Sequence, residues 1–202
     1  MVVGVDGGGL DDLLGLAVLG REEKTRQWLL WSKAWAHASV LERRKSEASI
    51  LRDFEEAGEL VICDRFGDDI AEIAALAGQI DGKGLLHAVA LDPYGVGAIV
   101  DALDEAGISG QERIVGISQG WKLTGAVKTA ERKLADGTLR HSGRGLMAWA
   151  VGNARVEPKG NAILVTKQAS GSAKIDPLMA AFNAIALMAT NPWSARPSVT
   201  WI

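Results

Sequence analysis

Three aspartates in the sequence stand where a strand should end or a helix should begin. Asp6 ends the apolar run 2–5, Asp92 ends the apolar run 88–91, and Asp176 lies between a glycine- and serine-containing loop and Pro177. In open α/β sheets, functional groups gather where strands end and the chain changes direction. Carboxylates that converge there are hard oxygen ligands of the kind that Mg²⁺ prefers. Two such ions about 3.5–4 Å apart can clamp the attacking and leaving oxygens of a phosphodiester displacement.

Each of these aspartates also has an ordinary structural interpretation. Asp176 could be the N-cap of a helix that has Pro177 in its first turn. Asp92 could open a simple turn over the sequence DPYG, and Asp6 could end its strand in a turn made with the three following glycines. The metal site is favoured because all three aspartates occupy element boundaries, whereas none of them would indicate it alone.

The basic residues are concentrated in one part of the chain. Residues 120–175 carry ten Lys and Arg against three acidic residues, whereas the rest of the chain carries 12 basic and 22 acidic residues. The net charge of −3 therefore hides a basic part beside an acidic part. This division is typical of a polyanion-binding face next to an acidic metal site, although solvated helix faces would produce the same imbalance.

Other kinds of site find little support. The segment GQIDGKG, 78–84, lacks the spacing and the Ser or Thr of a phosphate-binding P-loop. The three histidines lie far apart in the sequence, and the single cysteine, Cys63, excludes an internal disulfide framework and a cysteine-based zinc site. There is no apolar run of about 18 residues and no basic-then-apolar leader. We therefore expect no membrane contact and a reducing cytoplasm.

The hydrophobic pattern predicts an α/β domain with one core. Expected strands cover 2–6, 13–20, 26–36, 85–91 and 112–118, and a hairpin covers 153–165. Ser39 and Glu42 predict a capping box that starts a helix running to Ala57. Further helices are expected over 70–80, 96–107, 123–134 and 175–189. The order predicts a mixed sheet that begins antiparallel and continues parallel, in one domain over 1–190 with a tail over 191–202.

The wider pattern resembles the nuclease domain of the large terminase subunit of tailed double-stranded DNA bacteriophages. The resemblance covers nearly the whole chain, from the strand that ends in Asp6 and the pair Asp12-Leu13 to the last helix. Its most specific part is the stretch 148–189, which follows the family pattern W-x-x-x-N, G-N, Lys, I-D and an alanine-rich helix. This pattern is carried by Asn153, Asn161, Lys167 and Asp176. One departure is Arg144-Gly145, where the family commonly has Asn-Pro.

The resemblance implies a ribonuclease-H-like mixed central sheet with helices on both faces. It implies an endonuclease that cuts concatemeric viral DNA during genome packaging, in the cytoplasm of the infected or lysogenic bacterial host. Asp6, Asp92 and Asp176 would hold two Mg²⁺ or Mn²⁺ ions, with Asp12 as an auxiliary ligand. The partners would be double-stranded DNA, the terminase ATPase domain, the small terminase subunit and the portal. The ATPase needs a P-loop, so this chain is expected to be the nuclease domain alone.

The basic residues have expected roles on the DNA. Lys167 is expected near the scissile phosphate as a charge stabiliser, although it could be an ordinary solvated loop lysine. The residues expected to contact DNA phosphates without reading sequence are Lys122, Lys128, Arg132, Lys133 and Arg144. Two other classes of protein remain open: another ribonuclease-H-like enzyme, such as a junction resolvase, and a non-catalytic DNA-binding module.

Overall fold

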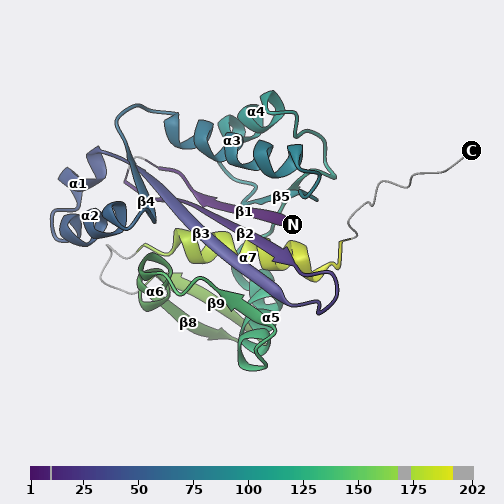
Figure 1. Ribbon diagram of the computed structural model, residues 1–202. Coiled ribbons are helices and arrows are strands. Elements are labelled where there is room, and N and C mark those ends of the chain that lie inside the picture. Colours follow the sequence, from purple (N-terminus) through teal and green to yellow (C-terminus); the bar gives the residue numbers. More distant parts are fainter. Residues whose placement is uncertain (10, 168–173, 193–202) are drawn as a thin grey trace, which may run out of the picture.

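One mixed β-sheet forms the centre of the molecule, with helices on both faces (Figure 1). The computed structural model describes residues 1–9, 11–167 and 174–192. In the described ranges the strands of this sheet are β1 (Val2–Gly7), β2 (Leu14–Arg21), β3 (Trp28–His37), β4 (Leu60–Cys63), β5 (Val89–Leu91), β6 (Ile114–Gly116) and β7 (Leu139–His141). Their order is β4-β3-β2-β1-β5-β6, and β7 also pairs with β3.

The direction of the strands follows the predicted order. β1, β2 and β3 pair antiparallel, whereas β5 pairs parallel with β1, and β6 with β5. On the other side, β4 and β7 both pair parallel with β3, at opposite ends of that long strand. The predicted antiparallel start and parallel continuation are therefore confirmed.

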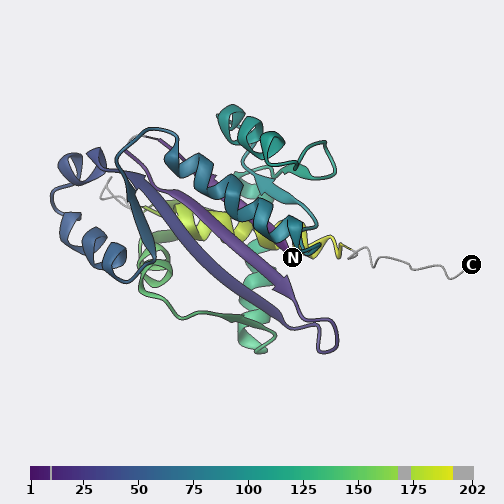
Figure 2. The same ribbon diagram turned by 45° about the horizontal axis from the view of Figure 1, so that its top comes forward.

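Helices cover the two faces of the sheet in separate groups (Figure 2). The helices are α1 (Ser39–Arg43), α2 (Ala48–Glu56), α3 (Asp68–Gly82), α4 (Gly97–Glu105), α5 (Thr124–Ala135), α6 (Gly145–Gly152) and α7 (Asp176–Ala189), with a 3₁₀ turn at Gly120–Leu123. α3 and α4 pack on one face, and α5 and α7 on the other. α7 lies directly against β1 and β2 (Figure 1).

The alternation of side chains along β1 explains how both faces are filled. Val3 and Val5 belong to the core under α3 and α4, whereas Val2 belongs to the core under α7. Gly4 faces α7, and a Cβ atom there would overlap the carbonyl oxygen of Ala180. On β2, a Cβ atom at Gly15 would lie 2.6 Å from the backbone carbonyl atoms of Asp176. These glycines let α7 approach the sheet more closely than any side chain would allow.

The hairpin predicted over 153–165 is also present, but it stands apart from the central sheet. It is formed by β8 (Ala154–Lys159) and β9 (Ala162–Lys167), which pair antiparallel around Gly160 and Asn161. Gly160 has φ +60°, a conformation that suits glycine in a tight turn. The hairpin leads from α6 towards the start of α7.

Several elements differ from the prediction. The helix expected over 39–57 is two helices, and α1 has Ala38 as its N-cap with no side-chain cap hydrogen bond, so the predicted Ser39–Glu42 capping box is wrong. The Ser39 hydroxyl lies 2.9 Å from Nδ1 of His37 instead. β4, β7 and α6 were not predicted, because β4 and β7 are short and α6 is apolar on most of its surface.

Two buried polar groups explain how the later elements are held. Glu59, 8% exposed, accepts hydrogen bonds from the backbone N–H groups of Gly145 (3.3 Å) and Leu146 (2.7 Å). These groups lie at the start of α6, where backbone N–H groups have no acceptor within the helix. Asn183, fully buried on α7, donates to the carbonyl oxygen of Val5 at 2.9 Å and accepts from Gln119 at 2.9 Å.

No helix in the described ranges is long and apolar enough to cross a membrane. Most of the predicted tail, 193–202, lies outside the described residues.

Candidate active site

Asp6 and Asp92 lie next to each other at the carboxyl ends of two neighbouring strands. Val5 of β1 is paired in register with Leu91 of β5, so the chain delivers the following aspartates to the same edge of the sheet. Both line one pocket of about 220 Å³, together with Tyr94. Asp92 also accepts a hydrogen bond from the backbone N–H of Tyr94 at 3.1 Å. The turn interpretation of Asp92 is therefore correct, and its role as a metal ligand stays a prediction.

Asp176 reaches the same region from α7. It is the first residue of that helix, Ile175 is the N-cap, and the cap has no side-chain hydrogen bond, so the N-cap interpretation of Asp176 is wrong. Its side chain is buried, with the residue only 4% exposed, beside the end of β1. A Cβ atom at Gly7 would lie 3.1 Å from Asp176 Oδ1. Within the part of the chain that the structure describes, Asp176 Oδ2 is buried and has no hydrogen-bond partner.

The electrostatics of these carboxyls show that they interact. Burial, then the negative charges of Asp176 and Asp92, raises the pKa of the Asp6 carboxyl to about 8, although Lys167 opposes the shift. Burial, then the charge of Asp12, raises the pKa of Asp176 to about 6. The pKa values of two of the three carboxyls are therefore raised. Carboxylates that are buried close together favour protonation unless a cation compensates their charge.

The carboxyls affect one another's pKa values, but their side chains do not yet surround a single ion position. Among the described residues, no group of three His, Cys, Asp or Glu side chains is arranged to hold an ion as it stands. The convergence of all three aspartates on one ion therefore stays a prediction, supported by the shared pocket of Asp6 and Asp92 and by the buried, unpartnered oxygen of Asp176.

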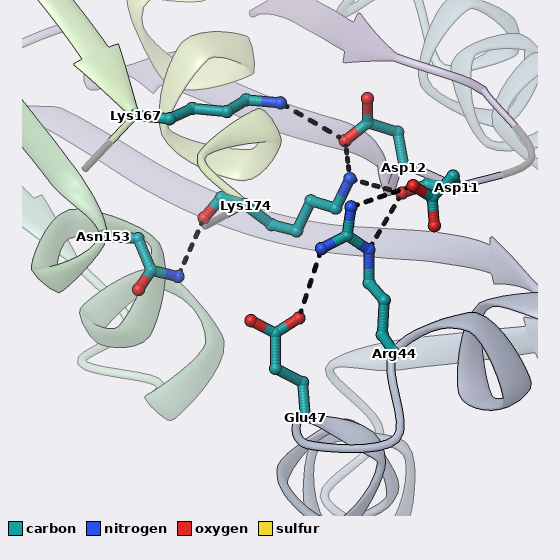
Figure 3. Close-up of polar contacts among 7 residues, drawn as sticks. All are labelled: Asp11, Asp12, Arg44, Glu47, Asn153, Lys167 and Lys174. Carbon is teal, nitrogen blue, oxygen red and sulfur yellow. Dashed lines mark hydrogen bonds and ion pairs between the residues drawn. The ribbon is translucent and has the colours of Figure 1, made fainter. Parts of the chain in front are cut away.

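Asp12 is held by two lysines (Figure 3). Lys174 donates from Nζ to Asp12 Oδ1 and to the backbone carbonyl oxygen of Asp11. Lys167, at the end of β9, places its Nζ 3.4 Å from the same Asp12 oxygen. The side chain of Lys174 is 4% exposed and that of Lys167 is 41% exposed. Lys174 is thus a buried link between the loop after β1 and the start of α7, whereas Lys167 remains open to solvent.

Contacts around this link reach the neighbouring helices (Figure 3). Asn153, after α6, donates to the backbone carbonyl oxygen of Lys174 at 3.1 Å. Arg44, between α1 and α2, donates to the carboxylate and the carbonyl oxygen of Asp11, both at 3.1 Å, and lies 3.6 Å from Glu47. The loop that carries Asp12 is therefore held by Arg44 on one side and by Lys174 on the other, and Asn153 in turn contacts Lys174.

Buried acidic side chains lie at the strand ends, and the hairpin brings a lysine beside them. This arrangement agrees with the protein family that the chain matches. The family "terminase large subunit, endonuclease domain" matches residues 1–191. The chain belongs to this family. No curated protein sequence matches the chain.

Two solved structures share the terminase nuclease fold. The large terminase of bacteriophage HK97 has a TM-score of 0.74 and 22% identity, over 92% of this chain and 38% of that chain. The large terminase nuclease from thermophilic phage G20c, solved with bound magnesium, has a TM-score of 0.55 and 14% identity, over 92% of this chain and 79% of that chain. The chain thus spans about 38% of the HK97 protein. These matches confirm the expected ribonuclease-H-like α/β fold.

The terminase domain presents its predicted DNA-contacting residues in different ways. Lys122, Lys128 and Arg132 are exposed, and the last two lie one helical turn apart on α5. Lys133 is half-buried, with its Nζ 4.4 Å from the ring centre of Trp28 and 3.4 Å from the Thr138 hydroxyl. Arg144 is half-buried at the N-cap of α6. The structure therefore exposes the first three more fully than the last two, and their roles stay predictions.

Lys174 is the main site residue that sequence reasoning missed. Only its place in the basic part of the chain and its position two residues before Asp176 marked it, and neither feature distinguishes a buried link from a solvated lysine. Its importance depends on a contact with Asp12, 162 residues away in the sequence.

The raised pKa values predict how pH affects the stability of the terminase domain. In the unfolded chain the Asp6 and Asp176 carboxyls lose their protons above about pH 4. In the folded protein they keep these protons to higher pH, because their pKa values are raised. Their contribution to stability is therefore complete below about pH 4 and is lost as pH rises through about 6 for Asp176 and about 8 for Asp6. We expect the wild-type protein in chelator to lose stability relative to Asp6→Asn as pH rises over this range. Thermal unfolding measures this difference, and a difference that does not change with pH would contradict the assignment.

Proposed function

We propose that this terminase domain is a divalent-metal-dependent DNA endonuclease that cuts concatemeric viral DNA during genome packaging. Asp6, Asp92 and Asp176 are its metal ligands and bind two Mg²⁺ or Mn²⁺ ions, and Asp12 is an auxiliary ligand. The observation that carries the proposal is the buried oxygen of Asp176, which has no partner among the described residues and lies beside the pocket shared by Asp6 and Asp92. The magnesium in the G20c terminase nuclease supports the choice of ion.

The donor set fits hard divalent cations. Carboxylate oxygens at the ends of β1 and β5 and at the start of α7 are the ligands that Mg²⁺ prefers. The pKa values of Asp6 and Asp176 are raised by burial and by neighbouring negative charge, and a bound cation would relieve both effects. When bound, such ions supply activation of the attacking water and stabilisation of the leaving oxygen.

The chain's own residues orient the substrate around these carboxylates. Lys174 holds Asp12 and the Asp11 carbonyl in place from a buried position. Lys167 is exposed and lies 3.4 Å from Asp12 at the end of β9, so its ammonium group can pair with an incoming phosphate. Lys122, Lys128 and Arg132 contact phosphates further along the DNA, and Lys133 and Arg144 extend this surface. Such contacts position the duplex without reading its sequence.

Plasmid nicking tests this proposal directly. We expect supercoiled DNA to be nicked and linearised in Mn²⁺ or Mg²⁺ but not in chelator, with no consensus at the sequenced ends. Cleavage restricted to four-way junctions would instead indicate a resolvase, and metal-independent binding without cleavage would indicate a non-catalytic module.

The family also suggests the setting of the reaction. We propose that the domain acts with a terminase ATPase domain, a small terminase subunit and a portal, in the cytoplasm of the bacterial host. Co-purification of the nuclease with these packaging proteins during phage induction is the matching observation.

A further inference from the structure

A second pocket lies away from the carboxylates, between the 3₁₀ turn and the tip of the β8–β9 hairpin. It has a volume of about 560 Å³, and its lining residues are Trp121, Lys122, Thr124, Lys159, Asn161 and Ala162. None of the acidic site residues lines it. This pocket needs a separate explanation, because the metal-site chemistry does not use it.

Hydrogen bonds hold the two walls of this pocket together. The Thr124 hydroxyl accepts from the backbone N–H of Ile163 at 3.1 Å, which joins the start of α5 to β9. The same hydroxyl lies 2.6 Å from the carbonyl oxygen of Trp121 and 3.1 Å from that of Ile163, either of which can accept its proton. These hydrogen bonds join two walls of the pocket that lie about 40 residues apart in the sequence.

The lining has an exposed aromatic ring and two cations. Trp121 is 55% exposed, and among the described residues its ring is not in an aromatic stack. Lys122 places its Nζ 5.9 Å from the centre of this ring, and Lys159 approaches from the hairpin. Stacking of a planar partner on an exposed ring buries apolar surface and adds a favourable aromatic contact, which stabilises the complex. Aromatic stacking with nearby cations is how proteins bind unpaired nucleotides.

We propose that this pocket binds an unpaired nucleotide of a DNA strand, with the base stacked on Trp121 and the flanking phosphates near Lys122 and Lys159. Asn161, at the hairpin turn, supplies a polar group for the base edge. The proposal rests on the proposed DNA-cleaving function for its substrate, but it assigns a site and a strand state that cleavage does not require.

The position of the pocket agrees with a strand that leaves the active site. β9 runs from Ala162, in the pocket, to Lys167, whose Nζ contacts Asp12. Six residues of extended strand span about 17 Å from first to last. A strand advances about 3.4 Å per nucleotide in a duplex and further when it is unpaired, so at most about five nucleotides connect the two places. The pocket is close enough to receive a strand end freed near the cut.

Binding of a fluorescent oligothymidylate tests the proposal without cleavage. Affinity is measured by anisotropy in chelator for the wild type, Trp121→Ala and Trp121→Phe, with a blunt duplex of the same length as the second probe. We expect Trp121→Ala to weaken single-strand binding about 5- to 140-fold, the factor that corresponds to about 1–3 kcal/mol per stacked base. Trp121→Phe should retain most of the affinity, and duplex binding should not change.

Two further variants separate this site from general charge and folding effects. Lys159→Ala should reduce the salt dependence of single-strand binding by about 0.7 per lost phosphate contact. Leu134→Ala, which removes another exposed apolar side chain of the basic part of the chain, should bind both probes as the wild type does. Unchanged single-strand binding by Trp121→Ala, or an equal loss for both probes, would overturn the proposal. Failure of plasmid nicking with a normal Trp121 effect would overturn only the proposed nuclease mechanism.

Discussion

Replacing Asp176 with asparagine should reduce DNA cleavage by about a thousandfold or more, the order of loss seen when a catalytic group is removed. The amide keeps the shape of the side chain but loses the charge that holds a cation. The same change at Asp6 and at Asp92 should have similar effects. Initial rates of plasmid nicking in Mn²⁺ measure the loss, and Asp53→Asn, on the exposed face of α2, is the matched control.

Stability separates a catalytic role of Asp176 from a structural one. Burial raises its pKa, so the charged form costs free energy in the absence of a cation. Asp176→Asn should therefore fold at least as stably as the wild type in chelator at about pH 8, while addition of Mn²⁺ should stabilise it less than the wild type. Normal cleavage by Asp176→Asn would show that the catalytic carboxylates lie elsewhere.

The second large effect is expected at Gly4, far from any chemistry. An alanine there would place its Cβ atom on the carbonyl oxygen of Ala180 and 2.6 Å from the backbone nitrogen of Ala184. Because both atoms belong to the backbone of α7, they cannot move aside as a side chain could. We expect Gly4→Ala to lower the free energy of unfolding by about 4 kcal/mol or more, which is exceptional for a single substitution. Chemical denaturation measures this change.

A glycine in open space provides the control for Gly4. Gly125, near the start of α5, has open space for a side chain, with no neighbouring atom within 4 Å of where a Cβ atom would lie. Gly125→Ala should therefore leave stability unchanged or raise it by about 0.4–1 kcal/mol. Wild-type stability of Gly4→Ala would show that α7 does not lie against β1 as closely as described. Because α7 carries Asp176, any displacement by Gly4→Ala should also reduce cleavage.

The arrangement of the central sheet could be predicted from local patterns. The apolar runs before Asp6 and Asp92 are strands, since a continuous run of branched side chains can be buried on both faces of a sheet. The register of β1 and β5 then places the following aspartates side by side, as the element boundaries suggested. The last helix was equally clear, because Pro177 and the alanine-rich apolar stretch favour its start and its burial.

Other features were beyond local patterns. The interruption between α1 and α2 accompanies the contacts of Arg44 with Asp11 and Glu47, and β7 is a strand of three residues paired with β3 about 110 residues earlier. A short segment has no periodicity of its own that could distinguish it from a loop. Its conformation is decided by the hydrogen bonds that a distant partner offers.

The sequence by itself determined that the three aspartates stand at element boundaries, that the sheet is mixed, and which family the chain resembles. Each of these depends on patterns of residue types within short stretches of the chain. Only the tertiary structure decided that Asp176 is buried at the first position of its helix rather than serving as its cap. It also decided that Asp12 is shared by an exposed lysine and a buried one. The physical reason is that burial and charge pairing depend on which distant segments meet, and Lys174 meets Asp12 across 162 residues.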